Sequence, residues 1–146
     1  METRSFRQGC GYALHVSAGS PETGGEIAKS SHFVLALKQA RRSRCRFRVG
    51  AVLVQGGRTL VLASNVPRNS PSIDYRHASF HAEEVIVRRV RKAPRAVLYV
   101  ARVDRAGSPM LARPCRRCQF ALYAAGITRA HYTTPQGYDL IRIQPQ

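Results

Sequence analysis

The chain has 146 residues, of which 44% are hydrophobic, and this composition is sufficient for one domain with a single buried core. No apolar run approaches the roughly 20 residues of a membrane-spanning helix, and the N-terminus lacks the apolar core of a signal peptide, so we expect a cytoplasmic protein. The formal net charge is +16, which predicts a polyanionic partner such as nucleic acid.

Arginine supplies most of this charge, and much of it falls in two clusters, at residues 41–48 and 88–95. Clustered cations favour sequence-independent attraction to phosphate groups. A compositional bias toward arginine codons would also produce part of the charge without any selection for nucleic acid. Both interpretations stay open at the level of sequence.

The first 29 residues are rich in glycine and show no sustained hydrophobic period, so we predict a loosely ordered extension over 1–29 and one domain over 30–146. A helix is predicted to begin at the Ser30 and Ser31 cap and to end near Arg42. Its apolar side would cover one face of a sheet.

Two apolar runs, 49–54 and 59–63, flank the pair Gly56 and Gly57 and predict a β-hairpin. A polar loop with two prolines follows and leads to Ser79. Loops of this length are usually functional or disordered.

The next elements alternate between helix and strand. A helix that starts at His81 has an apolar side, and Glu84 and Arg88 are spaced on it for an i,i+4 ion pair. The nearly continuous apolar run 96–103 is typical of a central strand covered on both faces. A second helix is predicted from Cys115 to about Ala125, where Gly126 ends it.

Two short strands, 130–133 and 138–143, are predicted at the end of the chain. Only four residues separate them, whereas a parallel pair needs a crossover of a dozen or more residues. They must therefore form an antiparallel hairpin if they are neighbours.

Two short motifs predict a metal site. His81, Ala82 and Glu83 form H-x-E, and Pro114 to Cys118 form P-C-x-x-C. Cysteines three positions apart at the start of a helix share one face. Two thiolates and one imidazole suit Zn²⁺ and leave a fourth position open, which is typical of a catalytic zinc. Glu83 is then the candidate acid and base.

H-x-E followed by P-C-x-x-C resembles the signature of the cytidine deaminase-like superfamily, and the resemblance covers roughly residues 30–143. It implies a three-layer α-β-α fold, with a mixed five-stranded sheet that ends in an antiparallel hairpin. That ending resembles free-cytidine deaminases, bacterial toxin deaminases and small phage deaminases. It departs from the tRNA adenosine deaminases and the polynucleotide cytosine deaminases of animals.

The resemblance also implies roles for single residues. His81, Cys115 and Cys118 would bind one Zn²⁺, and Glu83 would move protons between water, the ring nitrogen and the leaving amine. Four further residues are expected at the substrate, where Asn65 would hold the sugar and Arg68 a phosphate: Asn65, Arg68, Ala82 and Pro114.

The substrate is the less certain part of the interpretation. Free-cytidine deaminases follow the asparagine with a glutamate in N-x-E-N, but here the third position is Pro67, and their first metal ligand is usually cysteine rather than His81. We therefore expect deamination of cytosine in single-stranded nucleic acid, with DNA favoured. The alternative is free cytidine, deoxycytidine or deoxycytidine monophosphate.

Two further interpretations remain. Adenine deamination on RNA is disfavoured by the predicted antiparallel ending. A non-enzymatic, zinc-stabilised nucleic-acid-binding module would need His77 as a fourth ligand, in an H-x3-H pair with His81. Tyr75 and Phe80 are candidates for stacking on a base. The sequence does not predict the oligomeric state.

Overall fold

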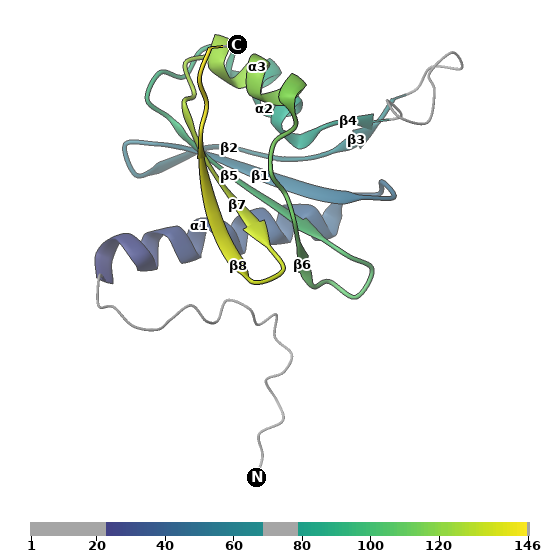
Figure 1. Ribbon diagram of the computed structural model, residues 1–146. Coiled ribbons are helices and arrows are strands. Elements are labelled where there is room, and N and C mark those ends of the chain that lie inside the picture. The colour runs from purple at the N-terminus through teal and green to yellow at the C-terminus, as the bar shows by residue number, and fades with distance from the viewer. Residues whose placement is uncertain (1–22, 69–78, 146) are drawn as a thin grey trace.

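The structure is a computed structural model that describes the backbone of residues 23–68 and 79–145 and the side chains in these ranges from Ser31 onward. The described part forms one mixed β-sheet with helices on both faces, as Figure 1 shows. No helix within these ranges is long and apolar enough to cross a membrane.

Helix α1 (Thr23–Arg42) ends where the sequence predicts but begins earlier than the predicted cap at Ser30. Serine within a helix costs well under about 1 kcal/mol and glycine about 1 kcal/mol, so neither residue forces a helix boundary. The predicted extension over 1–29 thus overlaps α1. Its remainder lies outside the described residues, and the division into extension and domain stays a prediction.

Helix α1 packs closely on the sheet. Phe33 and Leu37 are buried against Val52 and Tyr99 on one sheet face. A Cβ atom on Gly50 would lie 2.3 Å from both the Ala36 carbonyl oxygen and the Ala40 amide nitrogen. Only glycine permits this approach of helix to strand.

The predicted hairpin is confirmed as strands β1 (Arg48–Gln55) and β2 (Arg58–Ser64). The two turn residues, Gly56 and Gly57, have φ values of 59° and 80°. A two-residue turn with positive φ at both positions matches the twist of the strands that it joins.

A second, two-stranded sheet follows that the sequence does not predict. Strand β3 (Val66–Pro67) pairs antiparallel with β4 (Ser79–Phe80), so these strands join the two ends of the predicted loop. Residues 69–78, which include Tyr75 and His77, lie outside the described residues.

Helix α2 (Ala82–Val90) and strand β5 (Val97–Val103) follow as predicted, although α2 ends at Val90, well before Pro94. Strand β5 lies between β1 and β7, antiparallel to the first and parallel to the second. Its residues alternate between the two cores, which explains the continuous apolar run.

The remaining elements complete the sheet. Strand β6 (Pro109–Met110) folds back onto the end of β5, and helix α3 (Arg116–Ala124) follows it. Strands β7 (Arg129–Thr134) and β8 (Gly137–Arg142) form the predicted antiparallel hairpin. The main order is β2-β1-β5-β7-β8, and β6 adds a short sixth strand to the five predicted ones.

Two apolar cores lie on opposite faces of the sheet. One contains the buried residues of α1, and the other contains Ile86 of α2 and Leu122 of α3. Figure 1 shows α1 on one side of the sheet and α2 with α3 on the other. The predicted three-layer α-β-α fold is therefore confirmed.

Candidate metal centre and active site

The two predicted motifs meet at the N-termini of neighbouring helices. His81 is the N-cap of α2 and Cys115 is the N-cap of α3, and both have extended backbone conformations. Pro114 precedes the cap rather than occupying the first helical position. Helix N-termini present unpaired N–H groups and a partial positive charge, which favour anionic ligands and thiolates.

Three metal-ligating side chains lie together at this point. Nδ1 of His81 is 3.2 Å from Sγ of Cys118 and 3.6 Å from Sγ of Cys115. All three ligand atoms lie within 4.8 Å of one another. Cys118 is buried, His81 is partly buried and Cys115 is exposed, so the cluster is closed on the core side and reachable from outside.

The charges of this cluster fit a divalent cation. Hydrogen bonds from Cys118 and His81 lower the pKa of the Cys115 thiol to about 3. The hydrogen bond to Cys115, together with burial, raises the pKa of the Cys118 thiol, and the bond to Cys115 also raises the pKa of His81. The Cys115 thiol thus ionises readily, and its hydrogen bond with Cys118 disfavours ionisation of the Cys118 thiol. A divalent cation lets both thiols ionise, and the donor set of two sulfurs and one imidazole suits zinc.

Glu83 lies beside the cluster in the first turn of α2. It is 4% exposed, and its Oε1 has no hydrogen-bond partner among the described residues. Burial raises the pKa of this carboxyl, against the opposing effect of nearby His81. A buried carboxyl oxygen without a partner is costly, so it indicates a group held for a ligand or a reaction.

Glu84 connects the two motifs, a role that the spacing of residues within one helix does not predict. Its Oε1 accepts hydrogen bonds from the backbone N–H of His81, at 2.9 Å, and from Nη2 of Arg117, at 3.1 Å. The predicted ion pair of Glu84 with Arg88 is therefore wrong. The carboxylate satisfies the N-terminus of α2 and bonds to α3 instead, which a pattern within one helix does not reveal.

Asn65 lies between β2 and β3, and its side chain makes three hydrogen bonds within the protein. Oδ1 accepts hydrogen bonds from the Val49 N–H at 3.0 Å and the Ser43 hydroxyl at 2.6 Å, and Nδ2 donates to the Phe47 carbonyl at 2.6 Å. Asn65 is 5% exposed. These contacts describe a residue that holds the start of β1.

The other predicted substrate residues lie close to the metal ligands in the chain or in space. Ala82 is buried directly after His81, and Pro114 is buried directly before Cys115. The guanidinium group of Arg68 lies 4.3 Å from the ring centroid of Phe80, the residue that precedes His81. Tyr75 and His77 lie outside the described residues, so the four-ligand alternative is not tested by the geometry.

A family model described as "Cytidine and deoxycytidylate deaminase zinc-binding region" matches residues 27–134. This range contains all three ligand candidates and Glu83. A comparison with curated proteins finds no match.

Several solved structures are similar to the chain. The apo dCMP deaminase of cyanophage S-TIM5 has 21% sequence identity and a TM-score of 0.57, over 75% of this chain and 84% of that one. Cytidine deaminase from Burkholderia pseudomallei has 16% identity and a TM-score of 0.59, over 77% and 91%. Cytidine deaminase from Mycobacterium leprae has 23% identity and a TM-score of 0.51, over 75% and 90%. At these identities the likeness establishes the fold.

The family match and the clustered ligands agree with each other. The matched region is a zinc-binding one, and His81, Cys115 and Cys118 are positioned within it to bind a metal ion. The chain belongs to the cytidine and deoxycytidylate deaminase zinc-binding family, and it is a hydrolytic deaminase with zinc as its cofactor.

Proposed function

We propose that this protein hydrolyses the amino group of cytosine to give uracil and ammonia, with a free nucleoside or nucleotide as the first candidate substrate. The observation that carries this proposal is Glu83, a buried carboxyl with a partnerless oxygen beside the three metal ligands. A carboxyl in such surroundings is suited to proton transfer.

The metal ligands and Glu83 have separate roles in this proposal. His81, Cys115 and Cys118 hold the metal ion. When bound, zinc supplies hydroxide at neutral pH by lowering the pKa of a water molecule to about 7. Glu83 would accept one proton from the attacking water and pass it to the ring nitrogen, and it would then take the proton of the new hydroxyl group on the carbon and deliver it to the departing amine. One water is consumed, and the carbon that carried the amino group becomes a carbonyl.

Backbone groups complete the proposed site. The N–H groups of Ala82 and Cys115 lie at helix N-termini, where the helix offers them no acceptor. In this proposal these two N–H groups bind the polar edge of the base, and Pro114, which directly precedes Cys115, borders the base. Asn65 acts as a positioning residue in this proposal, because its amide already bonds to β1 and its neighbours.

The comparisons support a small substrate better than the single-stranded DNA favoured by the sequence. The similar solved structures are named cytidine deaminase and dCMP deaminase. Single-stranded nucleic acid stays the second candidate because of the +16 charge. Adenine on RNA is less favoured, since the antiparallel β7–β8 ending departs from the tRNA adenosine deaminases.

The test is uracil formation by the purified, zinc-loaded protein on cytidine, deoxycytidine and deoxycytidine monophosphate. A cytosine-containing single-stranded DNA oligonucleotide and adenosine are assayed in parallel, with Glu83→Gln as the blank. We expect the matching uridine, deoxyuridine or deoxyuridine monophosphate from at least one of the three small substrates, and at least about 100-fold slower formation by the blank. Turnover of adenosine alone would overturn the proposal, and so would wild-type activity in the blank.

A further inference from the structure

Two phenylalanine rings each have two arginine side chains stacked on them, and one of these rings, Phe80, directly precedes His81. The Phe80 centroid is 4.3 Å from Cζ of Arg68 and 4.0 Å from Cζ of Arg88. The second ring, Phe47, has Cζ of Arg102 at 4.9 Å and Cζ of Arg46 at 5.4 Å. We call these the Phe80 stack and the Phe47 stack. Stacking on a ring fixes the plane of a guanidinium group.

A short chain of contacts connects both stacks with the metal centre. Phe80 directly precedes His81, and across the small sheet it pairs with Val66. The next residue along the chain, Asn65, donates a hydrogen bond to the carbonyl of Phe47. These contacts link the two stacks to each other and to the residue directly before His81.

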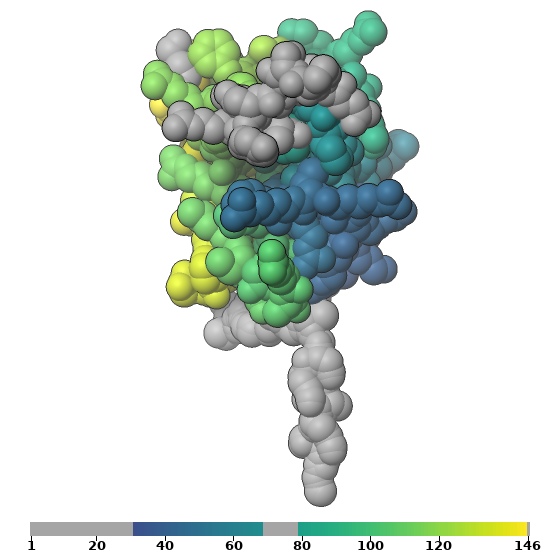
Figure 2. Space-filling view, turned by 90° about the vertical axis from the view of Figure 1, so that its right-hand side faces the viewer, coloured from purple at the N-terminus to yellow at the C-terminus, as the bar shows by residue number. Residues whose placement is uncertain are grey.

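Figure 2 shows the segments of the chain from which the two stacks come. A ridge formed by the segment after α1, in blue, crosses the middle of the face in view. Above it lies the teal segment that contains β4 and the start of α2, and below it lies the green segment around the end of β5. Phe47 comes from the first segment, Phe80 from the second and Arg102 from the third.

The four stacked arginines have no carboxylate partner among the described residues. The acidic side chains described from Ser31 onward are engaged elsewhere: Glu84 pairs with Arg117, Asp104 accepts from its own loop, Asp139 caps Leu140, and Glu83 is buried. Nε of both Arg68 and Arg102 is buried and lacks a hydrogen-bond partner in the described structure, so a ligand would meet the terminal N–H groups of these side chains. The positive charge of each stack is thus not neutralised by described side chains.

This arrangement suits a ligand with repeated phosphates and flat bases. A stacked guanidinium group presents its N–H donors at its edge, where they match the oxygens of a phosphate. Its outer plane, like an aromatic ring, can stack on a nucleobase. A mononucleotide has only one phosphate group and one base, so it would not contact two separate stacks.

We propose that the Phe80 stack and the Phe47 stack bind a single-stranded polynucleotide across this face. The nucleotide at the metal centre is followed by neighbours that contact first the Phe80 stack and then the Phe47 stack. The proposal rests on the proposed cytosine deamination only for the base that enters the metal centre. The binding surface itself does not depend on it.

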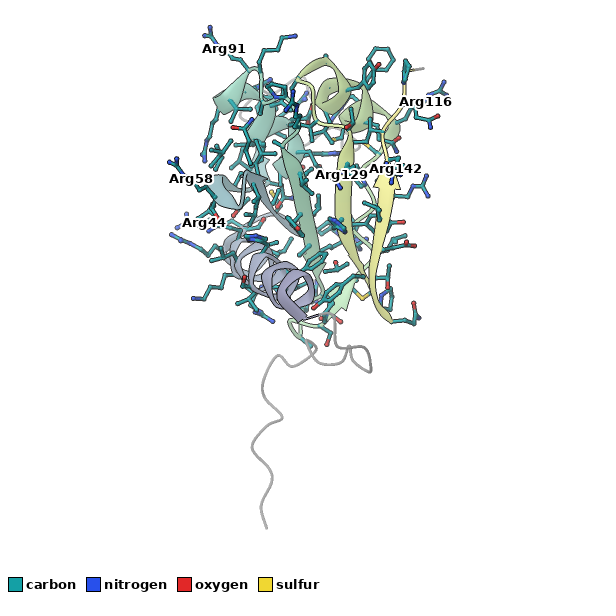
Figure 3. All side chains as sticks on the ribbon, turned by 90° about the vertical axis from the view of Figure 1, so that its left-hand side faces the viewer. Arg44, Arg58, Arg91, Arg116, Arg129 and Arg142 are labelled. Carbon is teal, nitrogen blue, oxygen red and sulfur yellow. The ribbon has the colours of Figure 1, made fainter. Side chains whose placement is uncertain are left out.

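The test measures the affinity of the zinc-loaded Glu83→Gln protein for a fluorescein-labelled single-stranded DNA oligonucleotide, so that no turnover disturbs binding. The double substitution Arg46→Gln and Phe47→Ser, in the same background, removes part of the Phe47 stack. The matched control is Arg58→Gln, which removes an exposed charge at the other end of β1, on the face seen in Figure 3. Zinc content and circular dichroism verify that each variant is folded.

We expect the Phe47-stack variant to bind the oligonucleotide about 10-fold more weakly than the Glu83→Gln parent. The affinity of the control should stay within about twofold of the parent. The slope of log affinity against log salt should fall by about 1 in the single variant Arg46→Gln. Equal losses in the stack variant and the control would overturn the proposal, because they would indicate diffuse attraction. Unchanged binding in the stack variant would also overturn it.

Three further arms identify the ligand. An RNA oligonucleotide of the same sequence distinguishes RNA from DNA, and a duplex tests whether unpaired bases are needed. We expect the duplex to bind more weakly than the single strand, and equal binding would contradict a single-stranded ligand. Wild-type turnover of cytidine, deoxycytidine and deoxycytidine monophosphate is measured separately. Its absence would count against the proposed function and leave the binding result unaffected.

Discussion

The imidazole Nδ1 of His81 lies 3.2 Å from Sγ of Cys118, although 37 positions of sequence separate the two residues. This contact forms because α2 and α3 begin side by side on one face of the sheet. The bridge from Glu84 to Arg117 fixes the same pair of helix ends. A metal ion at this point therefore stabilises the packing of the helices as well as supplying chemistry.

Cys118→Ala should abolish stoichiometric zinc binding and deaminase activity. The change removes a buried ligand and leaves two donors, which hold zinc weakly. Metal content by inductively coupled plasma spectrometry and the melting temperature measure the effect, and both should fall. Cys45→Ala is the control, because Cys45 is a free cysteine outside the ligand cluster. A Cys118 variant that retains one zinc per chain would contradict the assignment.

Glu83→Gln should reduce kcat by about 100-fold to 10,000-fold while zinc content stays unchanged. The amide keeps the shape of the side chain but cannot accept the proton of the attacking water. Deamination assays on the preferred substrate and metal analysis of the same preparation give the two readouts. Loss of zinc together with activity would show that Glu83 acts on the metal site rather than on the proton.

Gly50→Ala should destabilise the fold by at least about 1–3 kcal/mol. The added methyl group would lie 2.3 Å from backbone atoms of Ala36 and Ala40, and backbone cannot move aside as a flexible side chain can. Urea unfolding followed by circular dichroism measures the change. Thr59→Ala on the exposed part of β2 is the comparison, and it should alter stability by less than about 0.5 kcal/mol. Equal stability of the Gly50 variant and wild type would contradict the packing of α1 on β1.

Asn65→Ala should lower stability by about 1–3 kcal/mol, because it leaves the partly buried N–H of Val49 and the carbonyl of Phe47 without their partner. Thermal melting measures the loss. The sugar-binding role predicts a different result, a raised KM with an unchanged melting temperature. Kinetics and melting of one preparation thus distinguish the two roles.

Stability should decrease as pH falls below about 6.5 in a manner that depends on His32. Burial lowers the pKa of His32 below its ordinary value of 6.5, so the unfolded chain takes up the proton more readily than the folded one. The stabilising contribution of His32 is fully present above about pH 6.5, and it is lost as the pH drops through the pKa of His32 in the folded protein. Urea unfolding of the zinc-bound protein at about pH 7.5 and about pH 5.5 measures it. The variant His32→Phe should show a smaller difference in stability between the two pH values than the wild type. An equal difference would contradict the explanation.

Local patterns in the sequence determined most of the elements and the residue types of the site. The apolar runs on either side of Gly56 and Gly57 predicted the hairpin, and the short connection before β8 required an antiparallel ending. H-x-E and P-C-x-x-C predicted a zinc site, because metal chemistry restricts the ligands to a few residue types at fixed spacing. These inferences need only neighbours along the chain.

The tertiary structure decided which partners those residues choose. Glu84 had Arg88 within reach on its own helix, yet it bonds to Arg117 of α3, while Arg88 stacks on Phe80. Asn65 is a buried link to β1. The short strands β3 and β4 pair with each other although residues 68–78 separate them, so a local pattern does not reveal this pairing. Helix propensity was too weak to place the start of α1. Competition between local and distant partners is settled by packing and burial, and a single sequence does not display either.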